Sequence, residues 1–180
     1  MTRTLGIDPG SKPGYSECDT YTLIQRKYVT APTPLVLSVE TKFSEIGRKC
    51  DSPRKWHAAV TEGQDPAAKR HGTQAREENI ITLAATRGAQ LMRASLHCER
   101  CFVLPVKVWK NAVIADGMGL DKVVYCNRIA AALTDFERDI VNAVASVNAP
   151  ARLDVLDAIA INWALHILHF DSKYLWRIPC

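Results

Sequence analysis

The sequence lacks the features that mark several common classes of protein. No uninterrupted apolar run approaches the roughly 18 residues of a transmembrane helix, which excludes a helical membrane span. Asp8 interrupts the N-terminal apolar segment too early for a signal peptide, so we expect a cytoplasmic protein. No Gly-x-x-x-x-Gly-Lys loop is present to hold a nucleotide phosphate, and no serine or cysteine has the surroundings of a catalytic nucleophile. Metal-assisted hydrolysis remains, because it needs neither a phosphate-binding loop nor a protein nucleophile.

The six cysteines form no recognisable disulfide or metal-binding pattern. Cys98 and Cys101 have the Cys-x-x-Cys spacing of zinc ligands, and His97 precedes them. A structural zinc ion needs four ligands, however, and no second pair with matching spacing exists. We therefore predict ordinary, partly buried thiols, with a zinc site as the alternative interpretation.

The length and composition are those of one globular domain. The chain has 180 residues, of which 47% are hydrophobic and 23% charged, and we expect a single domain over residues 1–180. The formal net charge is +4, and many of the basic residues fall in one segment that contains few acids. They are Lys42, Arg48, Lys49, Arg54, Lys55, Lys69, Arg70 and Arg76. This segment forms either a solvated face or a surface that binds nucleic-acid phosphates, for which Lys69 and Arg70 are our DNA-binding candidates.

Hydrophobic periodicity predicts an α/β protein. Short apolar runs predict strands at residues 4–7, 56–61 and 101–106, with weaker strand-like segments between residues 14 and 25. Helical spacing predicts helices at residues 35–46, 74–96, 123–133 and 134–147, and a last helix that begins near Asp154. Asp121 and the pair Thr134 and Glu137 are typical helix caps. Strands that come early and then alternate with helices indicate a mixed central β-sheet flanked by α-helices.

Four carboxylates occupy positions that suit metal-dependent chemistry. Asp8 and Glu62 each follow an apolar strand, and the carboxyl ends of strands are where α/β sheets place their ligands. Asp154 and Asp157 are three residues apart at the start of a helix, so they share one face. Each residue alone is better explained as a turn, loop or helix-cap residue. If all four converge, however, they repel one another, and magnesium or manganese relieves that repulsion and allows phosphodiester hydrolysis.

Several segments of the chain resemble RuvC-type Holliday junction resolvases. Leu5–Ser11, with the following Gly14–Tyr15, is similar to the opening motif of that family. Ala59–Gln64 resembles its second acidic strand, and Leu153–Ile161 resembles its final Asp-x-x-Asp helix. Leu83–Leu91 is similar to the glycine-containing helix that follows the second motif. The order and approximate spacing of these segments agree over most of the chain.

The resemblance implies an RNase H-like fold and a homodimeric crossover-junction endodeoxyribonuclease, active in DNA recombination or repair. Such an enzyme makes paired cuts in four-way junctions with magnesium or manganese, two ions per active site. The implied catalytic and metal-binding residues are Asp8, Glu62, Asp154 and Asp157.

The resemblance also implies DNA-binding lysines and a dimer surface. Lys110 and Lys122 match two basic residues of the family, and Lys107 is a neighbouring candidate. Lysines at these positions would hold the scissile strand or offset developing charge, although solvated surface lysines are the alternative interpretation. The apolar helix around Gly88 is our expected dimer contact, and Gly88 itself indicates close approach of another element.

The chain departs from the family in two places. The family carries an aromatic residue that enters the junction centre in the loop after the second acid, whereas residues 65–73 contain no aromatic other than His71. That loop is basic, so contacts to the DNA backbone are expected to replace stacking, and a strict preference for four-way junctions is open. The segment Thr134–Asn148 is also longer than usual. Such divergence is typical of a phage-borne relative, so the expected location is the cytoplasm of a bacterium or of a phage-infected cell.

Other functions are also compatible with these residues. A broader debranching nuclease for flaps and Y-structures and an RNA-processing RNase H-like nuclease use the same carboxylates. A non-catalytic DNA-binding module is the alternative from a different class. An actin-like ATPase or sugar kinase also has a first strand that ends in Asp-x-Gly, but such enzymes normally need two domains of this size.

Overall fold

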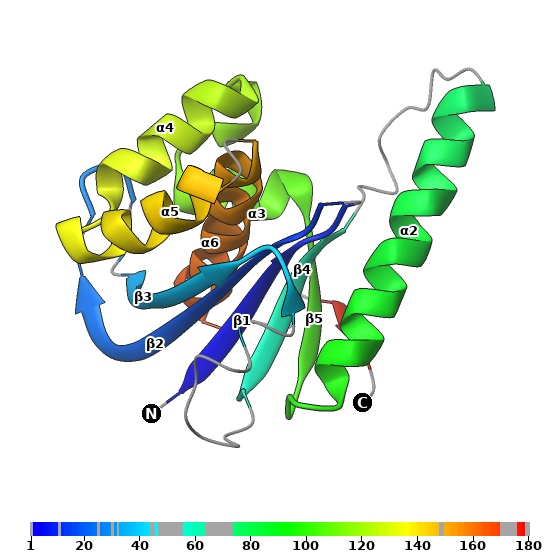
Figure 1. Ribbon diagram of the computed structural model, residues 1–180, viewed down its shortest axis with the longest axis horizontal. Coiled ribbons are helices and arrows are strands. Elements are labelled where there is room, and N and C mark those ends of the chain that lie inside the picture. The colour runs from blue at the N-terminus through cyan, green and yellow to red at the C-terminus, as the bar shows by residue number, and fades with distance from the viewer. Residues whose placement is uncertain are drawn as a thin grey trace.

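A mixed β-sheet forms the centre of the protein in its computed structural model (Figure 1). The structure describes residues 2–10, 12–24, 26–29, 31, 33–43, 46, 56–63, 74–147, 150–169 and 176–178. Within them the sheet has six strands in the order β3-β2-β1-β4-β5-β6. These are β1 (Arg3–Asp8), β2 (Gly14–Ile24), β3 (Thr33–Glu40), β4 (Ala58–Gly63), β5 (Cys101–Pro105) and β6 (Trp176–Ile178). The first three strands form an antiparallel meander, β4 and β5 run parallel to β1, and β6 is antiparallel to β5.

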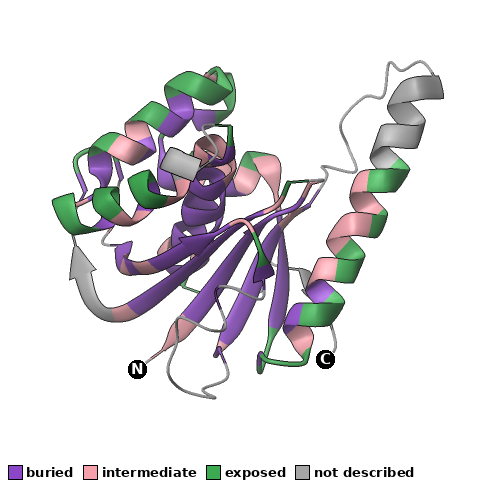
Figure 2. Cartoon of the chain, viewed as in Figure 1, coloured by how far each residue is buried: buried purple, intermediate pink, exposed green. Residues whose placement is uncertain are grey.

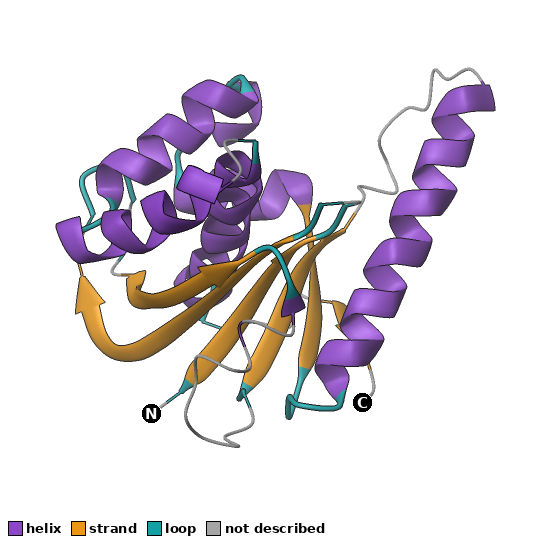
Figure 3. Cartoon of the chain, viewed as in Figure 1, coloured by secondary structure: helices purple, strands orange, loops and turns teal. Residues whose placement is uncertain are grey.

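Helices cover both faces of the sheet (Figure 3). The described helices are α2 (Gln74–Ser95), α3 (Val106–Val113), the 3-10 turn η1 (Gly117–Gly119), α4 (Lys122–Ala132), α5 (Asp135–Val147) and α6 (Ala151–Ile167). Helices α3 to α6 pack on one face, and α2 lies against the other. The predicted mixed α/β architecture is therefore confirmed. None of the described helices is both long and apolar enough to cross a membrane.

Successive side chains of β1 point to opposite faces of the sheet, so they contact different helices. Leu5 and Ile7 join a core cluster with Leu91 and Ala94 of α2. The intervening residues point to the opposite face, since successive strand residues alternate. This second face is covered mainly by α6, an almost wholly buried helix (Figure 2). A helix that is apolar all round needs such burial, because it has no polar face for solvent.

A glycine of β1 and a buried asparagine of α6 hold α6 directly against β1 and β2. A Cβ atom on Gly6 would lie 2.3 Å from the carbonyl oxygen of Ala158, so no larger residue allows this approach. Asn162 donates to the backbone oxygens of Thr4 and Ser16, both at 3.1 Å. These directional bonds fix the position of α6 along the sheet as well as its distance from it.

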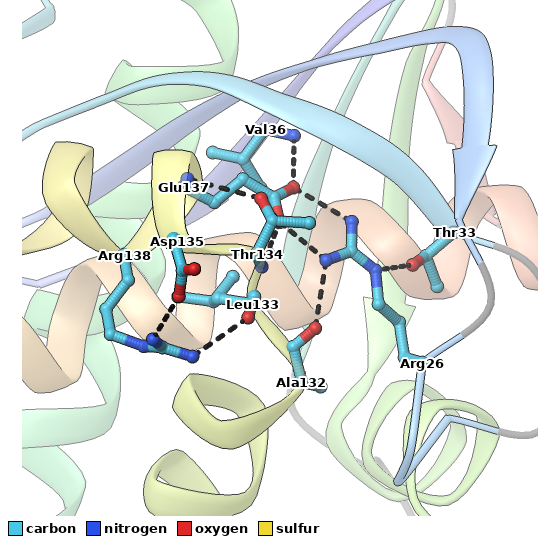
Figure 4. A network of polar contacts seen from close by, with 9 residues as sticks. All are labelled: Arg26, Thr33, Val36, Ala132, Leu133, Thr134, Asp135, Glu137 and Arg138. Carbon is cyan, nitrogen blue, oxygen red and sulfur yellow. Dashed lines mark hydrogen bonds and ion pairs between the residues drawn. The ribbon is translucent and has the colours of Figure 1, made fainter.

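A buried ion pair attaches α5 to the β2–β3 hairpin (Figure 4). The Arg26 guanidinium pairs with the Glu137 carboxylate through two nitrogens, and its Nε donates to Thr33 at 2.9 Å. Glu137 also accepts hydrogen bonds from the backbone nitrogens of Val36 at 2.7 Å and Thr134 at 2.8 Å. The second of these belongs to the predicted capping box, which is confirmed.

The structure corrects four sequence predictions. Residues 33–40 form the strand β3, so the helix expected at residues 35–46 is wrong there, because pairing with β2 outweighs an ambiguous apolar pattern. An additional helix, α3, follows β5 directly. Helix α6 begins at Ala151, so Asp154 lies in its first turn and is not its cap. In addition, a Cβ atom on Gly88 would meet nothing within 4 Å, so no other element of the described chain approaches it closely.

Candidate metal centre

Asp8 and Glu62 lie side by side at the carboxyl ends of two adjacent parallel strands. The register of β1 and β4 places Ile7 opposite Thr61, and each acid is the next residue on its strand. Both acids therefore leave the sheet on the same face, the one covered by α6. The parallel strand pair explains how residues 54 positions apart in the sequence become neighbours.

Asp154 and Asp157 approach the same edge of the sheet from the first turns of α6. They are three residues apart, so one face of the helix carries both. A Cβ atom on Gly14 would lie 2.1 Å from the carbonyl oxygen of Asp154, so only glycine lets β2 pass this turn of the helix. The glycine therefore sets how close the helix carboxylates come to the strand carboxylates.

All four predicted acids line one cavity of about 500 Å³, which we call the carboxylate cavity. Three lysines also line it: Lys12, Lys110 and Lys122. The remaining lining residues are Pro9, Gly10, Leu83, Val106 and Trp109. The cavity thus combines a negative floor with positive side chains, an arrangement suited to a cation beneath a polyanion.

Three acids of the carboxylate cavity, Asp8, Glu62 and Asp157, resist ionisation. Burial raises the pKa of Asp8 well above its usual value, and the charges of Asp157 and Glu62 add to that effect. Burial and then the charge of Asp157 raise the pKa of Glu62 to about 7. Burial also raises the pKa of Asp157, although Lys122 opposes the shift. Carboxylates placed close together repel one another and so favour a bound counter-cation.

Lys122 is the positive side chain that contacts the helix carboxylates. Its Nζ lies 3.2 Å from Asp154 Oδ1 and 3.0 Å from Asp157 Oδ2. Burial works against its charge, but the neighbouring Asp157 carboxylate raises the pKa of Lys122 above its usual value. Lys110 is held differently, with Nζ 5.4 Å from the ring centroid of Trp109 and 5.3 Å from that of Tyr125.

The donor set fits a hard divalent cation. Four carboxylates supply only oxygen atoms, which magnesium and manganese prefer. Among the described residues, however, no three Asp, Glu, His or Cys side chains are grouped tightly enough to hold an ion as they stand. The ammonium of Lys122 occupies the space between two of the acids. The four carboxylates are therefore suitable ligands for a metal ion, and the positive charge of Lys122 lies next to two of them.

The other predicted site residues lie elsewhere. Lys107 is exposed on α3 and is not among the residues that line the carboxylate cavity. Lys69 and Arg70 lie outside the described residues, as does most of the basic segment to which they belong. Cys98 and Cys101 are buried and take part in no disulfide within the described part of the chain.

Three residues near the acids carried no role in the sequence predictions. Lys12 lines the cavity, and its place just after the Asp8-Pro-Gly turn could have indicated this. Arg87 of α2 donates to the backbone oxygen of Glu62 at 3.5 Å. The Cys126 thiol donates to Asp157 Oδ1 at 3.5 Å, and burial and the Asp157 charge raise the thiol pKa, which keeps it protonated. No pattern along the sequence links Arg87 or Cys126 to the acids.

Comparison with solved structures reveals which fold this is. The chain is similar to Thermus thermophilus RuvC in complex with a Holliday junction substrate, with a TM-score of 0.54 and 11% identity over 99% of this chain and 100% of that one. It is also similar to a second Thermus thermophilus RuvC structure, with a TM-score of 0.50 and 13% identity over 98% of this chain and 100% of that one. The chain has a RuvC-like fold.

The sequence comparisons add nothing to this likeness. No protein-family model matches the chain, and no curated protein matches it in sequence. At the identities of the two RuvC structures the likeness concerns architecture, and it confirms the RNase H-like fold expected from the motifs.

Proposed function

We propose that this protein is a divalent-metal-dependent nuclease that cuts branched DNA, with four-way junctions as its principal substrate. One observation carries the proposal: Asp8, Glu62, Asp154 and Asp157, from three different elements, surround a single cavity that lysines also line. The RuvC-like fold supports it, and the structure with a TM-score of 0.54 is that of a RuvC bound to a Holliday junction.

The four carboxylates are the proposed ligands of magnesium or manganese, two ions per active site. A bound ion of this kind activates a water molecule and stabilises the leaving oxygen of a phosphodiester. The chain itself keeps Asp8 and Glu62 on a rigid sheet edge and Asp154 and Asp157 on a buried helix. Such rigid elements position ligands more accurately than loops do.

Lysines around the carboxylate cavity are the proposed contacts for the DNA backbone. Lys110 and Lys122 lie at the cavity, and Lys107 lies nearby on the exposed side of α3. Lys69 and Arg70 are proposed as further phosphate contacts on the basic loop. Positive side chains bind phosphates irrespective of base sequence, so they would position the DNA without reading it.

A homodimer is part of the proposal, because paired cuts in a four-way junction need two active sites. Helix α2 exposes Ile81 and Met92, and Leu96 follows directly after the helix; each has more than two thirds of its surface accessible. These apolar side chains and the open space around Gly88 are a suitable contact for a second copy. Light scattering should show a dimer at working concentration, and a monomer with and without junction DNA would contradict this part of the proposal.

The decisive experiment is cleavage of a synthetic immobile four-way junction in the presence of magnesium, with the nicks mapped on each arm. A matched set of flap, Y-structure, RNA–DNA hybrid and linear duplex substrates measures specificity. Symmetric nicks on opposed strands of the junction are expected, and chelator should abolish them. Equal cutting of linear duplex would contradict junction specificity. Binding without cutting under every metal condition would favour a non-catalytic DNA-binding protein.

A further inference from the structure

Lys122 is placed between the two carboxylates of α6 in the carboxylate cavity. Its Nζ is within 3.2 Å of an oxygen of Asp154 and of an oxygen of Asp157. One ammonium group therefore bridges both helix carboxylates. Its side chain is 45% exposed, so the charged end is open to solvent on one side.

The backbone that carries Lys122 is firmly held, whereas its side chain is long and partly exposed. Lys122 is the first residue of α4, and the Asp121 carboxylate caps that helix by accepting from Val123 N at 2.8 Å. Tyr125 and Cys126, in the next turn, are buried. The ammonium can therefore leave the carboxylates by side-chain rotation alone, without movement of the helix.

The oxygens that Lys122 contacts are proposed ligands of the divalent ion. An ammonium a few ångströms from a divalent ion is strongly repelled in a partly buried site, where water screens charges incompletely. The two cations therefore cannot share the Asp154 and Asp157 oxygens at full occupancy. One must move before the other binds.

We propose that Lys122 is an internal counter-ion, which holds Asp154 and Asp157 together in the metal-free protein and competes with the divalent ion for them. The inference rests on the proposed function, because it takes the four carboxylates as the metal site. DNA phosphates at the cavity attract the same ammonium and so release the carboxylate oxygens. Lys122 thereby makes metal binding tighter in the substrate complex than in the free protein, and the coupling is reciprocal.

Calorimetric titration of Mn²⁺ into the DNA-free protein tests this inference. The titration is run at about pH 8, above the raised pKa of Glu62 of about 7. Lys122→Met should bind the ion roughly tenfold more tightly than wild type or better, because the competing charge is gone. Lys122→Arg retains the charge and should bind like wild type. Lys122→Gln, which still donates a hydrogen bond, repeats the measurement with a smaller change to the fold.

A matched control and a melting experiment complete the test. Lys27→Met removes the same charge from an exposed position just after β2, at the opposite end of that strand from Gly14, and should leave the affinity unchanged. The rise in melting temperature on adding Mn²⁺ should be larger for Lys122→Met than for wild type. Equal or weaker binding by Lys122→Met and Lys122→Gln would overturn the inference and leave the proposed metal site intact. Tighter binding by Lys27→Met would also overturn it, whereas no ion binding by any variant would contradict the metal site itself.

Discussion

The buried acid Glu137 and the acids of the carboxylate cavity lie on the same face of the sheet, and they differ in which groups balance their charge. Glu137 meets a guanidinium, two backbone N–H groups and the Thr134 hydroxyl, so its oxygens are well supplied with donors (Figure 4). In the carboxylate cavity, Asp8 and Asp157 face other acids, with Lys122 as the lysine in direct contact with Asp157.

The pKa values show the consequence of this difference. Burial alone would raise the pKa of Glu137, but the Arg26 hydrogen bonds and backbone donors lower it below its usual value. In the cavity, burial raises the pKa values of Asp8, Glu62 and Asp157, and neighbouring carboxylates add to the rise for Asp8 and Glu62. A fully paired acid stabilises the fold, whereas under-compensated acids are costly unless a ligand joins them. The comparison therefore separates scaffold from candidate site.

The largest expected effect is on cleavage, from Asp8→Asn. Loss of one ligand should lower the rate of junction cleavage by about a thousandfold, because a metal contributes several kcal/mol and about 1.4 kcal/mol corresponds to tenfold. Binding of the junction should persist, since the lysines are unchanged. Single-turnover cleavage and gel-shift assays measure both. Asp139→Asn, an exposed change on α5, is the control, and similar cleavage by the two variants would reject Asp8 as a ligand.

Glu137→Gln tests whether the paired acid Glu137 stabilises the fold. The change leaves the buried Arg26 guanidinium without its counter-charge, so the free energy of unfolding should fall by roughly 3–5 kcal/mol. Denaturant unfolding measures this value. Asp135→Asn on the same helix also removes a carboxylate paired with an arginine, but that pair is exposed and should contribute less than about 1 kcal/mol. If the two changes lower the free energy of unfolding equally, the buried Arg26–Glu137 pair contributes no more to stability than an exposed pair.

Glu62→Gln should raise the free energy of unfolding of the metal-free protein, whereas Glu137→Gln lowers it. The raised pKa means that the folded state disfavours ionised Glu62, so stability is lost as pH rises from the unfolded value of 4.5 to about 7. At neutral pH and above, the variant should be more stable than wild type by about 1 kcal/mol, a value reduced for the partial exposure of the side chain. The difference should vanish below about pH 4.5. The measurement is a series of unfolding curves for both proteins at several pH values. A stability difference that does not change with pH would contradict the interpretation of Glu62.

The smallest expected effect is that of the metal on thermal stability. Magnesium or manganese at about three times its dissociation constant should stabilise the folded protein by about 0.8 kcal/mol, which raises the melting temperature by about two degrees. Differential scanning fluorimetry with and without chelator measures the shift. Asp157→Asn should reduce it, whereas Glu137→Gln should retain it from a lower starting temperature. A metal-induced shift that survives in Asp157→Asn would place the ion elsewhere.

The parts of the fold that were predicted correctly are those with a strong local pattern. Strand β1 ends at the Asp-Pro-Gly turn, α2 has clear helical spacing, and Asp121 and Thr134 carry the side chains of helix caps. The four acids could be chosen for the same reason, because each lies at a strand end or a helix start. Helix α3 was missed although Trp109 and Val113 have helical spacing, since the preceding strand ran directly into it.

Other features depend on contacts between distant residues and left no local pattern. Residues 33–40 become a strand because β2 offers a pairing edge, although their apolar run also suited a helix. The Arg26–Glu137 pair joins residues 111 positions apart. The contacts of Arg87 with β4 and of Cys126 with Asp157 likewise exist only after the sheet and helices have packed.

The sequence by itself indicated most of the elements in their order, the α/β class and four candidate acids, because periodicity, turns and caps act over a few residues. Only the tertiary structure decided that these acids line one cavity, that Glu137 is paired with Arg26 whereas Asp8 lies among other acids, and that Lys122 lies between Asp154 and Asp157. Charge interactions depend on distance and burial in space, and the chain acquires both only when Gly6 and Gly14 let α6 settle on the sheet.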